Sequence, residues 1–327
     1  MNLEKINEHV YKLMIPIPVP LKAVNVYLLK GPDGWCIIDT GFHDPETEQV
    51  WIETFRHLGI AWSDVRTIVV THYHPDHYGA SGWLQEKTGA EVMVSEKESG
   101  YLERNWLDSN YPRELCAFFE KYGMPPSIAE GVLEEHNSRL PVVSPHPKIS
   151  WIKENEELRL GPYSFKGIWT PGHTEGLMVF WEEREKILIS NDMVLPKITP
   201  NISFSPDSLE NPLMNFFQSL DKVRRLDPKI TWPGHRNLIE DLHTRIDEIK
   251  KHHEERLEDV REITKQICLE SGGSASGWDI CLRMFGLLNE PVQHKFALAE
   301  TLAHTEYLVH QGIIKRKEDA RTIRYMV

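Results

Sequence analysis

The chain has 327 residues, of which 40% are hydrophobic and 26% are charged, so it is long enough for one large domain with an appendage and can bury a sizeable core. Its formal net charge is −12. This acidic balance disfavours strong non-specific binding to nucleic acid or to an anionic membrane surface.

Neither the N-terminus nor the cysteines indicate secretion. The first residues mix charges through the segment, and no run approaches the roughly 20 apolar residues that a membrane span requires. The cysteines are dispersed and show no paired spacing, which argues against a disulfide framework. We therefore expect a cytoplasmic protein with no membrane association and with free thiols at Cys36, Cys116, Cys268 and Cys281.

The first 95 residues predict alternating strands and helices. Short aliphatic and β-branched runs separated by Pro or Gly are typical of strands, and apolar residues at spacings of three to four are typical of helices. Gly59 is placed to end the first helix. This alternation indicates an α/β layered fold. The expected strands cover 9–16, 23–30, 34–41, 66–70 and 90–95, and the expected helices 46–59 and 76–89.

Residues 97–145 interrupt this alternation with an aromatic segment of broadly helical spacing, longer than an ordinary connection. Two interpretations of this helical insertion stay open. Its aromatic side chains form a lid over the functional site, which would favour a substrate with an apolar part. Alternatively, they form the core of the insertion itself.

Strands return after the insertion, followed by a helix at about 207–226, a further strand and a long charged helical pattern over 237–266. We expect a catalytic domain over 1–245 and a connecting helix over 246–270. His252 and His253 lie in the charged pattern, which predicts that both belong to a solvated face. The expected strands here are 157–160, 163–170, 176–181, 186–190 and 229–232.

The last segment, 271–327, opens with a Gly- and Ser-rich run over 271–277 that predicts a flexible joint. Two helices, near 279–288 and over 291–310, and two short extended runs then suggest a small winged-helix-like domain. From residue 245 onward the chain has 13 basic and 14 acidic residues, so it lacks a clear basic face. We expect it to pack on the catalytic domain or on a second subunit in a homodimer. Nucleic acid is a disfavoured partner, although the basic run 315–324 keeps it open.

The stretch "VVTHYHPDHYGA", residues 69–80, combines an apolar run with a cluster of ligand-type side chains. In an extended chain His72 and His74 project to the same side. Asp76 and His77 follow where a helix would begin. A polar turn does not need four such residues in six positions, whereas imidazole and carboxylate groups suit zinc and related divalent metals.

Three further candidates follow apolar runs in the same manner. They are His173 in "TPGHTEG", Asp192 in "ISND" and His235 in "WPGH". A lone histidine in a turn is more often a hydrogen-bonded surface residue than a ligand. With the first cluster, however, the three candidates indicate a metal site built at strand ends.

In this order, "THYHPDH", "GHT", "ND" and "GH" resemble the signature of the metallo-β-lactamase-fold hydrolases, and more narrowly of their glyoxalase II-like branch, over residues 9–245. The resemblance implies an αββα sandwich with two metals at one edge. It implies that Asp192 bridges both metals and that Asp39 orients ligands through hydrogen bonds, although an aspartate before Gly41 also suits a turn cap. The implied ligands are His72, His74 and His173 for the first metal and Asp76, His77 and His235 for the second.

Two divalent ions, most simply zinc but with iron or manganese open, can share a water, lower its pKa toward neutrality and polarise the attacked oxygen. Asp76 and Asp192 would orient the resulting hydroxide or accept its proton. We therefore expect hydrolysis of a small ester-like substrate, such as a thioester, a lactone or another activated acyl compound.

Two alternatives remain. The winged-helix-like tail suggests an endoribonuclease or other phosphodiesterase, but only 19 positions separate His173 from Asp192, too few for an inserted nucleic-acid-binding domain. Flavin-dependent di-iron relatives carry glutamate in place of the second histidine, so His74 disfavours that branch. A mono-iron sulfur dioxygenase keeps the histidines and stays open.

Overall fold

The computed structural model describes residues 2–18, 21–318 and 321–327. Its strands are β1 (Leu3–Lys5), β2 (Val10–Pro16), β3 (Ala23–Gly31), β4 (Gly34–Ile38), β5 (Val65–Val70), β6 (Glu91–Ser95), β7 (Ile149–Ile152), β8 (Glu157–Leu160), β9 (Tyr163–Trp169), β10 (Met178–Glu182), β11 (Ile187–Asn191), β12 (Ile230–Pro233), β13 (Ala275–Ser276), β14 (Lys315–Glu318) and β15 (Ile323–Met326). Its α-helices are α1 (Pro45–Leu58), α2 (Pro75–Tyr78), α3 (Ser81–Thr88), α4 (Ser99–Trp106), α5 (Tyr111–Lys121), α6 (Pro126–Arg139), α7 (Pro212–Arg224), α8 (Leu242–Ser271), α9 (Gly277–Phe285) and α10 (Pro291–His310).

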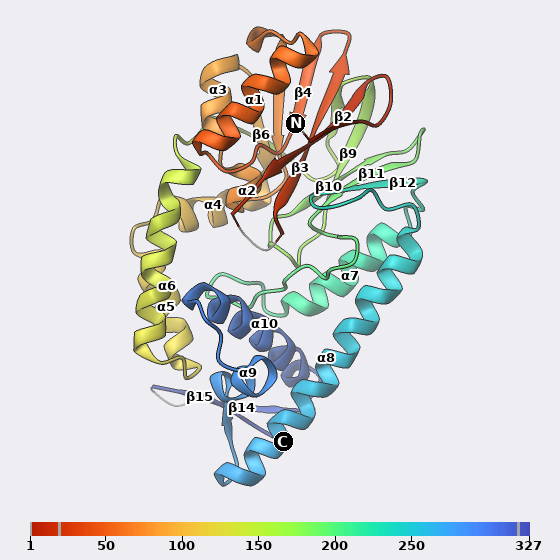
Figure 1. Cartoon of the computed structure of the whole chain (residues 1–327). Coiled ribbons are helices and arrows are strands. Elements are labelled where there is room, and N and C mark those ends of the chain that lie inside the picture. The colour runs from red at the N-terminus through yellow and green to blue at the C-terminus, as the bar shows by residue number, and fades with distance from the viewer. Residues whose placement is uncertain (1, 19–20, 319–320) are drawn as a thin grey trace.

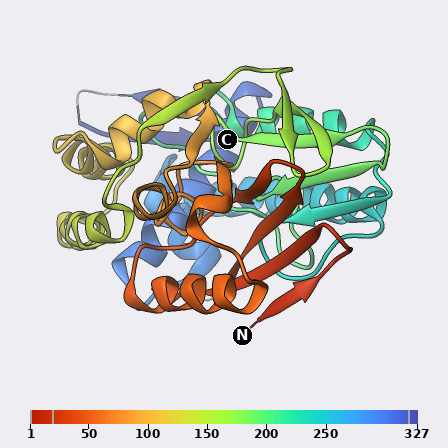
Figure 2. The ribbon, with the colours of Figure 1, turned by 90° about the horizontal axis from the view of Figure 1, so that it is seen from above.

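Two β-sheets stack face to face and are covered by helices on their outer faces (Figures 1 and 2). One sheet has the order β1-β2-β3-β4-β5-β6-β7 and the other the order β12-β11-β10-β9-β8. Tyr27 of the first sheet and Phe165 of the second belong to the apolar cluster between them. Trp51 of α1 packs on the outer face of the first sheet, and Phe216 of α7 packs on that of the second. This is the αββα sandwich expected from the sequence.

Strand direction brings the predicted site residues to one edge of the sandwich. Strands β4 and β5 are parallel neighbours in the first sheet, and β11 and β12 are parallel neighbours in the second. Strand β9 runs in the same direction as β11, because both are antiparallel to β10, which lies between them. The carboxyl ends of these five strands therefore meet, which is where open α/β sheets usually form their sites.

Local signals account for the first helix, whereas the helix expected after β5 departs from expectation. Asp44 caps the N-terminus of α1 by accepting from the Thr47 N–H at 2.8 Å, and Gly59 ends it in the left-handed region at φ 66°. The helix expected over 76–89 is instead two helices, α2 and α3, with a break at Gly79 and Ala80. The Gly79 backbone is so close to the carbonyl oxygens of Pro75 and Val142 that a Cβ would lie 2.4–2.5 Å from them. At this break the chain therefore packs closely against the Val142 backbone.

The insertion and the C-terminal segment form one apolar cluster, which we call the shared core. Phe119 of α5 and Tyr122 belong to it together with Trp278 of α9, Leu298 of α10 and Tyr325 of β15. The Trp278 N–H donates to the Tyr122 carbonyl at 2.9 Å, which ties the two segments together. The insertion's aromatic side chains therefore do not form a core of their own. In Figure 1, α5 and α6 (yellow) lie beside α9 and α10 (blue).

The segment 271–277 is not the flexible joint expected from its composition. Ala275 and Ser276 pair with β15, and Ala275 is fully buried. The pairing completes a three-stranded sheet in the order β13-β15-β14, beside α9 and α10. The winged-helix likeness of this segment stays a prediction. Among the described helices, none is both long and apolar enough to cross a membrane.

The prediction that His253 is solvated is wrong, because its side chain is 1% exposed between α7, α8 and α10. His304 Nδ1 donates to the Glu300 carbonyl at 2.8 Å, so His304 Nε2 accepts from His253 Nδ1 at 3.0 Å. Burial lowers the pKa of His253 to about 2 and that of His304 to about 4, with the nearby Arg256 guanidinium adding to both shifts. His252, the other histidine assigned to that face, is half-buried. The charged sequence pattern therefore did not predict the buried, neutral pair of His253 and His304.

We predict that this pair makes the protein less stable in acid. Below pH 6.5 the unfolded histidines bind protons while the folded pair stays neutral, so stability is full above pH 6.5 and declines as the pH falls toward 4. The free energy of unfolding should fall by on the order of 1–2 kcal/mol more between pH 7.5 and 5.5 in the wild type than in His253→Gln. Denaturant titration at each pH measures this difference. His57→Gln, at an exposed position of α1, should retain the wild-type dependence, and an unchanged slope in His253→Gln would contradict the prediction.

Candidate metal centre

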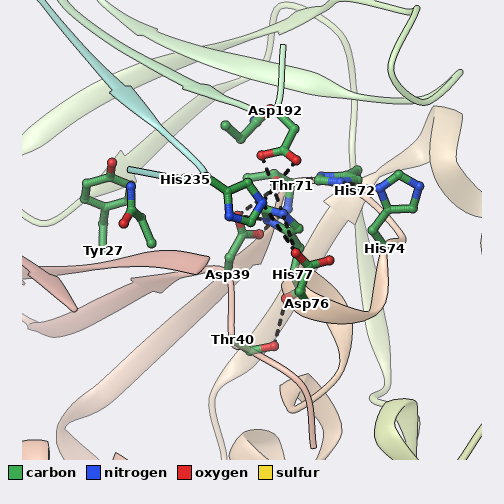
Figure 3. Close-up of polar contacts among 12 residues, drawn as sticks. Tyr27, Asp39, Thr40, Thr71, His72, His74, Asp76, His77, Asp192 and His235 are labelled. Carbon is green, nitrogen blue, oxygen red and sulfur yellow. Dashed lines mark hydrogen bonds and ion pairs between the residues drawn. The ribbon is translucent and has the colours of Figure 1, made fainter. Parts of the chain in front are cut away.

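Five strand ends supply the candidate site, and Figure 3 labels residues from four of them, β4, β5, β11 and β12. Asp39 follows β4, residues 71–77 follow β5, His173 follows β9, Asp192 follows β11 and His235 follows β12. The structure brings together all eight residues singled out from the sequence. Ligand-type atoms lie within 4.8 Å of one another in three groups: His72, His74 and His173; His72, His77 and Asp192; and Asp76, His77 and His235.

The first group consists of three converging imidazoles. His74 Nδ1 lies 3.0 Å from His72 Nε2 and 3.0 Å from His173 Nε2. Burial lowers the pKa of all three, and the mutual proximity of the rings lowers those of His72 and His74 further. These histidines are therefore neutral at neutral pH and offer nitrogen lone pairs.

In the first group, the Nδ1 protons of His173 and His72 are donated to hydrogen-bond acceptors outside the group. His173 Nδ1 donates to the Asn201 carbonyl at 3.0 Å. His72 Nδ1 donates to Thr71 Oγ1 at 3.0 Å, since the Thr71 hydroxyl itself donates to Asp39. The Nε2 atoms of His72 and His173 therefore both point a lone pair at His74 Nδ1. A single proton on His74 Nδ1 can bond to only one of these two lone pairs. Nitrogens bound tetrahedrally at about 2.0–2.1 Å from a zinc ion would be about 3.3 Å apart, close to the separation seen.

The group of Asp76, His77 and His235, which we call the second group, pairs one carboxylate with two imidazoles. Asp76 Oδ2 lies 3.4 Å from His235 Nε2 and 3.7 Å from His77 Nε2. Burial alone would raise the pKa of Asp76 and lower those of the two histidines. The mutual attraction of the opposite charges outweighs it, so the pKa of Asp76 is lowered and that of His235 is raised to about 10. The Asp76 carboxylate and the His235 imidazolium therefore form a buried ion pair.

Asp192 lies between the two groups. Its Oδ2 is 3.3 Å from His235 Nε2 and 3.6 Å from His173 Nε2, and its Oδ1 is 3.6 Å from His77 Nε2. Burial favours its neutral form, but His235 and His77 overcome that effect and hold the pKa of Asp192 well below its usual range. Asp192 is therefore an anion in contact with both groups.

Unpartnered atoms show that this residue set fits divalent metal ions. His77 Nε2, His235 Nε2 and Asp192 Oδ1 are buried and lie 3.3–3.7 Å from oppositely charged atoms, yet none of them has a hydrogen-bond partner. Buried polar atoms are rarely left without a partner, because each costs about 1–3 kcal/mol. These atoms are of the types that zinc prefers and point into one space, so a cation there would satisfy them.

Asp39 holds the turn over residues 71–77 in place. Its Oδ1 accepts from the Thr71 N–H at 2.8 Å, and its Oδ2 accepts from Thr71 Oγ1 at 3.0 Å and from His77 Nδ1 at 2.8 Å. The Asp39 side chain is 2% exposed. It bonds directly to His77 and reaches His72 through the Thr71 hydroxyl. These contacts link the end of β4 to the end of β5, so the role of Asp39 is not limited to capping the turn before Gly41.

Comparison with known proteins accounts for this architecture. The family model of the metallo-beta-lactamase superfamily matches residues 19–235, and the model of the metallo-beta-lactamase-like C-terminal domain matches residues 262–327. The chain belongs to the metallo-beta-lactamase superfamily. The superfamily match contains every ligand-type residue of the site described above.

Two relatives match nearly the whole chain and a third matches about half of it. A crystal structure of the metallo-beta-lactamase family protein TTHA1429 from Thermus thermophilus has a TM-score of 0.84 and 31% identity, and the match covers 98% of this chain and 99% of that one. The probable metallo-hydrolase YqjP of Bacillus subtilis is 24% identical over 97% of this chain and 98% of its own length. A hydroxyacylglutathione hydrolase of Bdellovibrio bacteriovorus is 21% identical over 51% of this chain and 47% of its own.

Several supporting residues of this metallo-beta-lactamase site were missed in the sequence. Strand β3 holds the turn that carries His235: Asn25 Nδ2 donates to the Pro233 carbonyl at 3.0 Å, and His235 Nδ1 donates to the Ala23 carbonyl at 2.7 Å. Thr71 was also missed, although its position as the first polar residue after β5 was a usable signal. A backbone acceptor such as Ala23 leaves no mark in the sequence.

The loop that carries His173 is held from the side of the first sheet. Thr174 Oγ1 donates to Glu98 Oε1 at 2.5 Å, and the fully buried Glu98 was not singled out from the sequence. Burial raises the pKa of Glu98 to about 8, so the group takes up a proton more readily than an ordinary glutamate. A Cβ on Gly176 would lie 2.4 Å from the Glu98 nitrogen, which shows how closely the two segments pack.

We predict that Gly234→Ala disrupts the site. A Cβ at Gly234 would lie 2.1 Å from Asp192 Oδ1 and 2.9 Å from His77 Cε1, so one or both side chains must move. Metal content should fall by about one equivalent per chain, measured by elemental analysis after dialysis. Gly100→Ala is a matched control, because a Cβ there meets nothing within 4 Å. Full metal content in Gly234→Ala would contradict the prediction.

Proposed function

We propose that this metallo-hydrolase binds two divalent ions, most simply zinc, and cleaves a small ester-like substrate. In this proposal His72, His74 and His173 hold the first ion, Asp76, His77 and His235 hold the second, and Asp192 bridges them. The observation that carries it is the convergence of two unpartnered imidazole nitrogens and one carboxylate oxygen beside three neutral imidazoles. Contact of Asp192 with members of both groups supports the bridging role.

Two divalent ions so held would activate a water molecule for attack and stabilise negative charge on the substrate oxygen. The chain's own part is orientation and proton transfer. The Asp76 side chain is 14% exposed, against 6% for that of Asp192. Asp76 is therefore the more accessible carboxylate to take a proton from the attacking water, while the more enclosed Asp192 sets the separation of the two groups.

We propose an activated acyl compound as the substrate: a thioester, a lactone or a related ester. The resemblance of the motif to the glyoxalase II-like branch supports this class, and so does the partial match to a protein named hydroxyacylglutathione hydrolase. The net charge of −12 favours a small molecule over nucleic acid. The endoribonuclease and sulfur dioxygenase alternatives are outcomes of the assay described next.

We predict that His74→Ala lowers the metal content and abolishes turnover. His74 Nδ1 is the atom that contacts both other imidazoles of the first group, so its loss removes one of three nitrogen donors. The purified wild type should contain two zinc ions per chain and hydrolyse a thioester or lactone. The variant should lose at least one ion, and its kcat/KM should fall by about 10²-fold or more. His57→Ala, on the exposed face of α1, is the control.

The same measurements can overturn the proposal. A panel of thioester, lactone, phosphodiester and single-stranded RNA substrates identifies the bond that is cleaved. Cleavage of RNA alone would replace the acyl-hydrolase assignment with the endoribonuclease one. One iron per chain with oxygen consumption would establish the dioxygenase alternative. Retained activity with full metal in His74→Ala would refute the ligand assignment.

A further inference from the structure

The candidate metal centre is connected to the C-terminal segment by a chain of hydrogen bonds. His173 Nδ1 donates to the Asn201 carbonyl at 3.0 Å, and Asn201 Nδ2 donates to Glu300 Oε2 of α10 at 3.0 Å. The Glu300 carbonyl in turn accepts from His304 Nδ1, which is paired with His253. A predicted ligand in the sandwich is thus linked to helix α10 of the C-terminal segment through one intervening residue.

The segment that carries Asn201 depends on α10 for its position. Residues 199–205 form neither helix nor strand. The Phe204 N–H donates to the Ala299 carbonyl at 3.0 Å, so two successive α10 residues hold the segment. The intervening Ile202 is fully buried in the apolar cluster that also includes Ala303. Asn201 Oδ1 accepts from Ser203 Oγ at 2.7 Å, which fixes the amide so that its nitrogen faces Glu300.

We propose that Glu300 is a positioning residue for His173, acting through Asn201, and that the C-terminal segment thereby completes the first metal group. The inference rests on the proposed function, in which His173 is a ligand. The Asn201 carbonyl takes the proton on His173 Nδ1 and leaves Nε2 unprotonated toward His72 and His74. Residues that orient a metal-bound imidazole typically change affinity by 10–100-fold when they are lost. A residue one step further out should act at the lower end of that range.

The experiment compares three variants of the full chain loaded with Co²⁺ in place of zinc. Glu300→Ala should weaken binding at one of the two sites by about tenfold and should change the visible absorption of the bound cobalt. Glu300→Gln should restore wild-type binding and absorption, because its amide oxygen still accepts from Asn201. Affinity is measured by competition with a chromophoric chelator, so the readout does not depend on turnover.

Glu306→Ala is the matched control. Glu306 is another glutamate of α10, with a buried side chain that accepts from Tyr325 at 2.6 Å and from Arg316 at 3.1 Å. Its loss should lower the thermal unfolding temperature without altering cobalt affinity or absorption. Unchanged binding and absorption in Glu300→Ala would overturn the inference, and so would an equal loss of affinity in Glu306→Ala.

The outcomes separate this inference from the proposed function. Two metal ions and ester hydrolysis in the wild type, with normal cobalt binding by Glu300→Ala, would refute the positioning role and leave the proposed function intact. A wild-type chain that binds no metal would refute both.

Discussion

The geometry of the candidate metal centre depends on a single buried carboxylate, that of Asp39. It accepts from His77 Nδ1 and from the Thr71 hydroxyl. The first bond directs His77 Nε2 into the site, and the second leaves the Thr71 oxygen free to accept from His72 Nδ1. One side chain therefore sets the inward-facing nitrogen of an imidazole in each group. Asp39 does so from a left-handed backbone conformation at φ 61°, which costs energy and is tolerated where the surrounding structure imposes it.

The other outward-facing imidazole nitrogens for which the structure gives a partner are held by backbone carbonyls. His235 donates to Ala23 of β3, and His173 donates to Asn201 of an irregular segment. A carbonyl in a sheet cannot rotate away, so β3 fixes His235 as firmly as the sandwich itself is fixed. The Asn201 carbonyl has no such sheet and depends on its contacts with α10. The two groups are therefore supported differently, the second within the sandwich and the first partly from outside it.

The sequence was informative where chemistry and strand pattern coincide. Apolar runs ending in His or Asp predicted the strand ends, and the period-two alternation of His72 and His74 predicted that they face one space. It was uninformative where structure depends on distant contacts. The charged pattern around His253 concealed a buried pair, because helical periodicity does not reveal which helices will pack on a face. Within the Gly- and Ser-rich run over 271–277, Ala275 and Ser276 form a short strand because β15, about 50 residues later, pairs with them.

Partners that act through the backbone also escape sequence reasoning. No property of Ala23 or Asn201 predicts that its carbonyl will accept from an imidazole, and Gly234 shows its role only once the distance to Asp192 is known. The same limit applies to the C-terminal segment. Composition suggested an appendage, yet the insertion and the C-terminal segment bury one core, and α10 extends from it to the segment that holds His173. That segment contacts the sandwich through His173 and contacts α10 through Ala299 and Glu300, whereas His235 of the second group is held by Ala23 of β3.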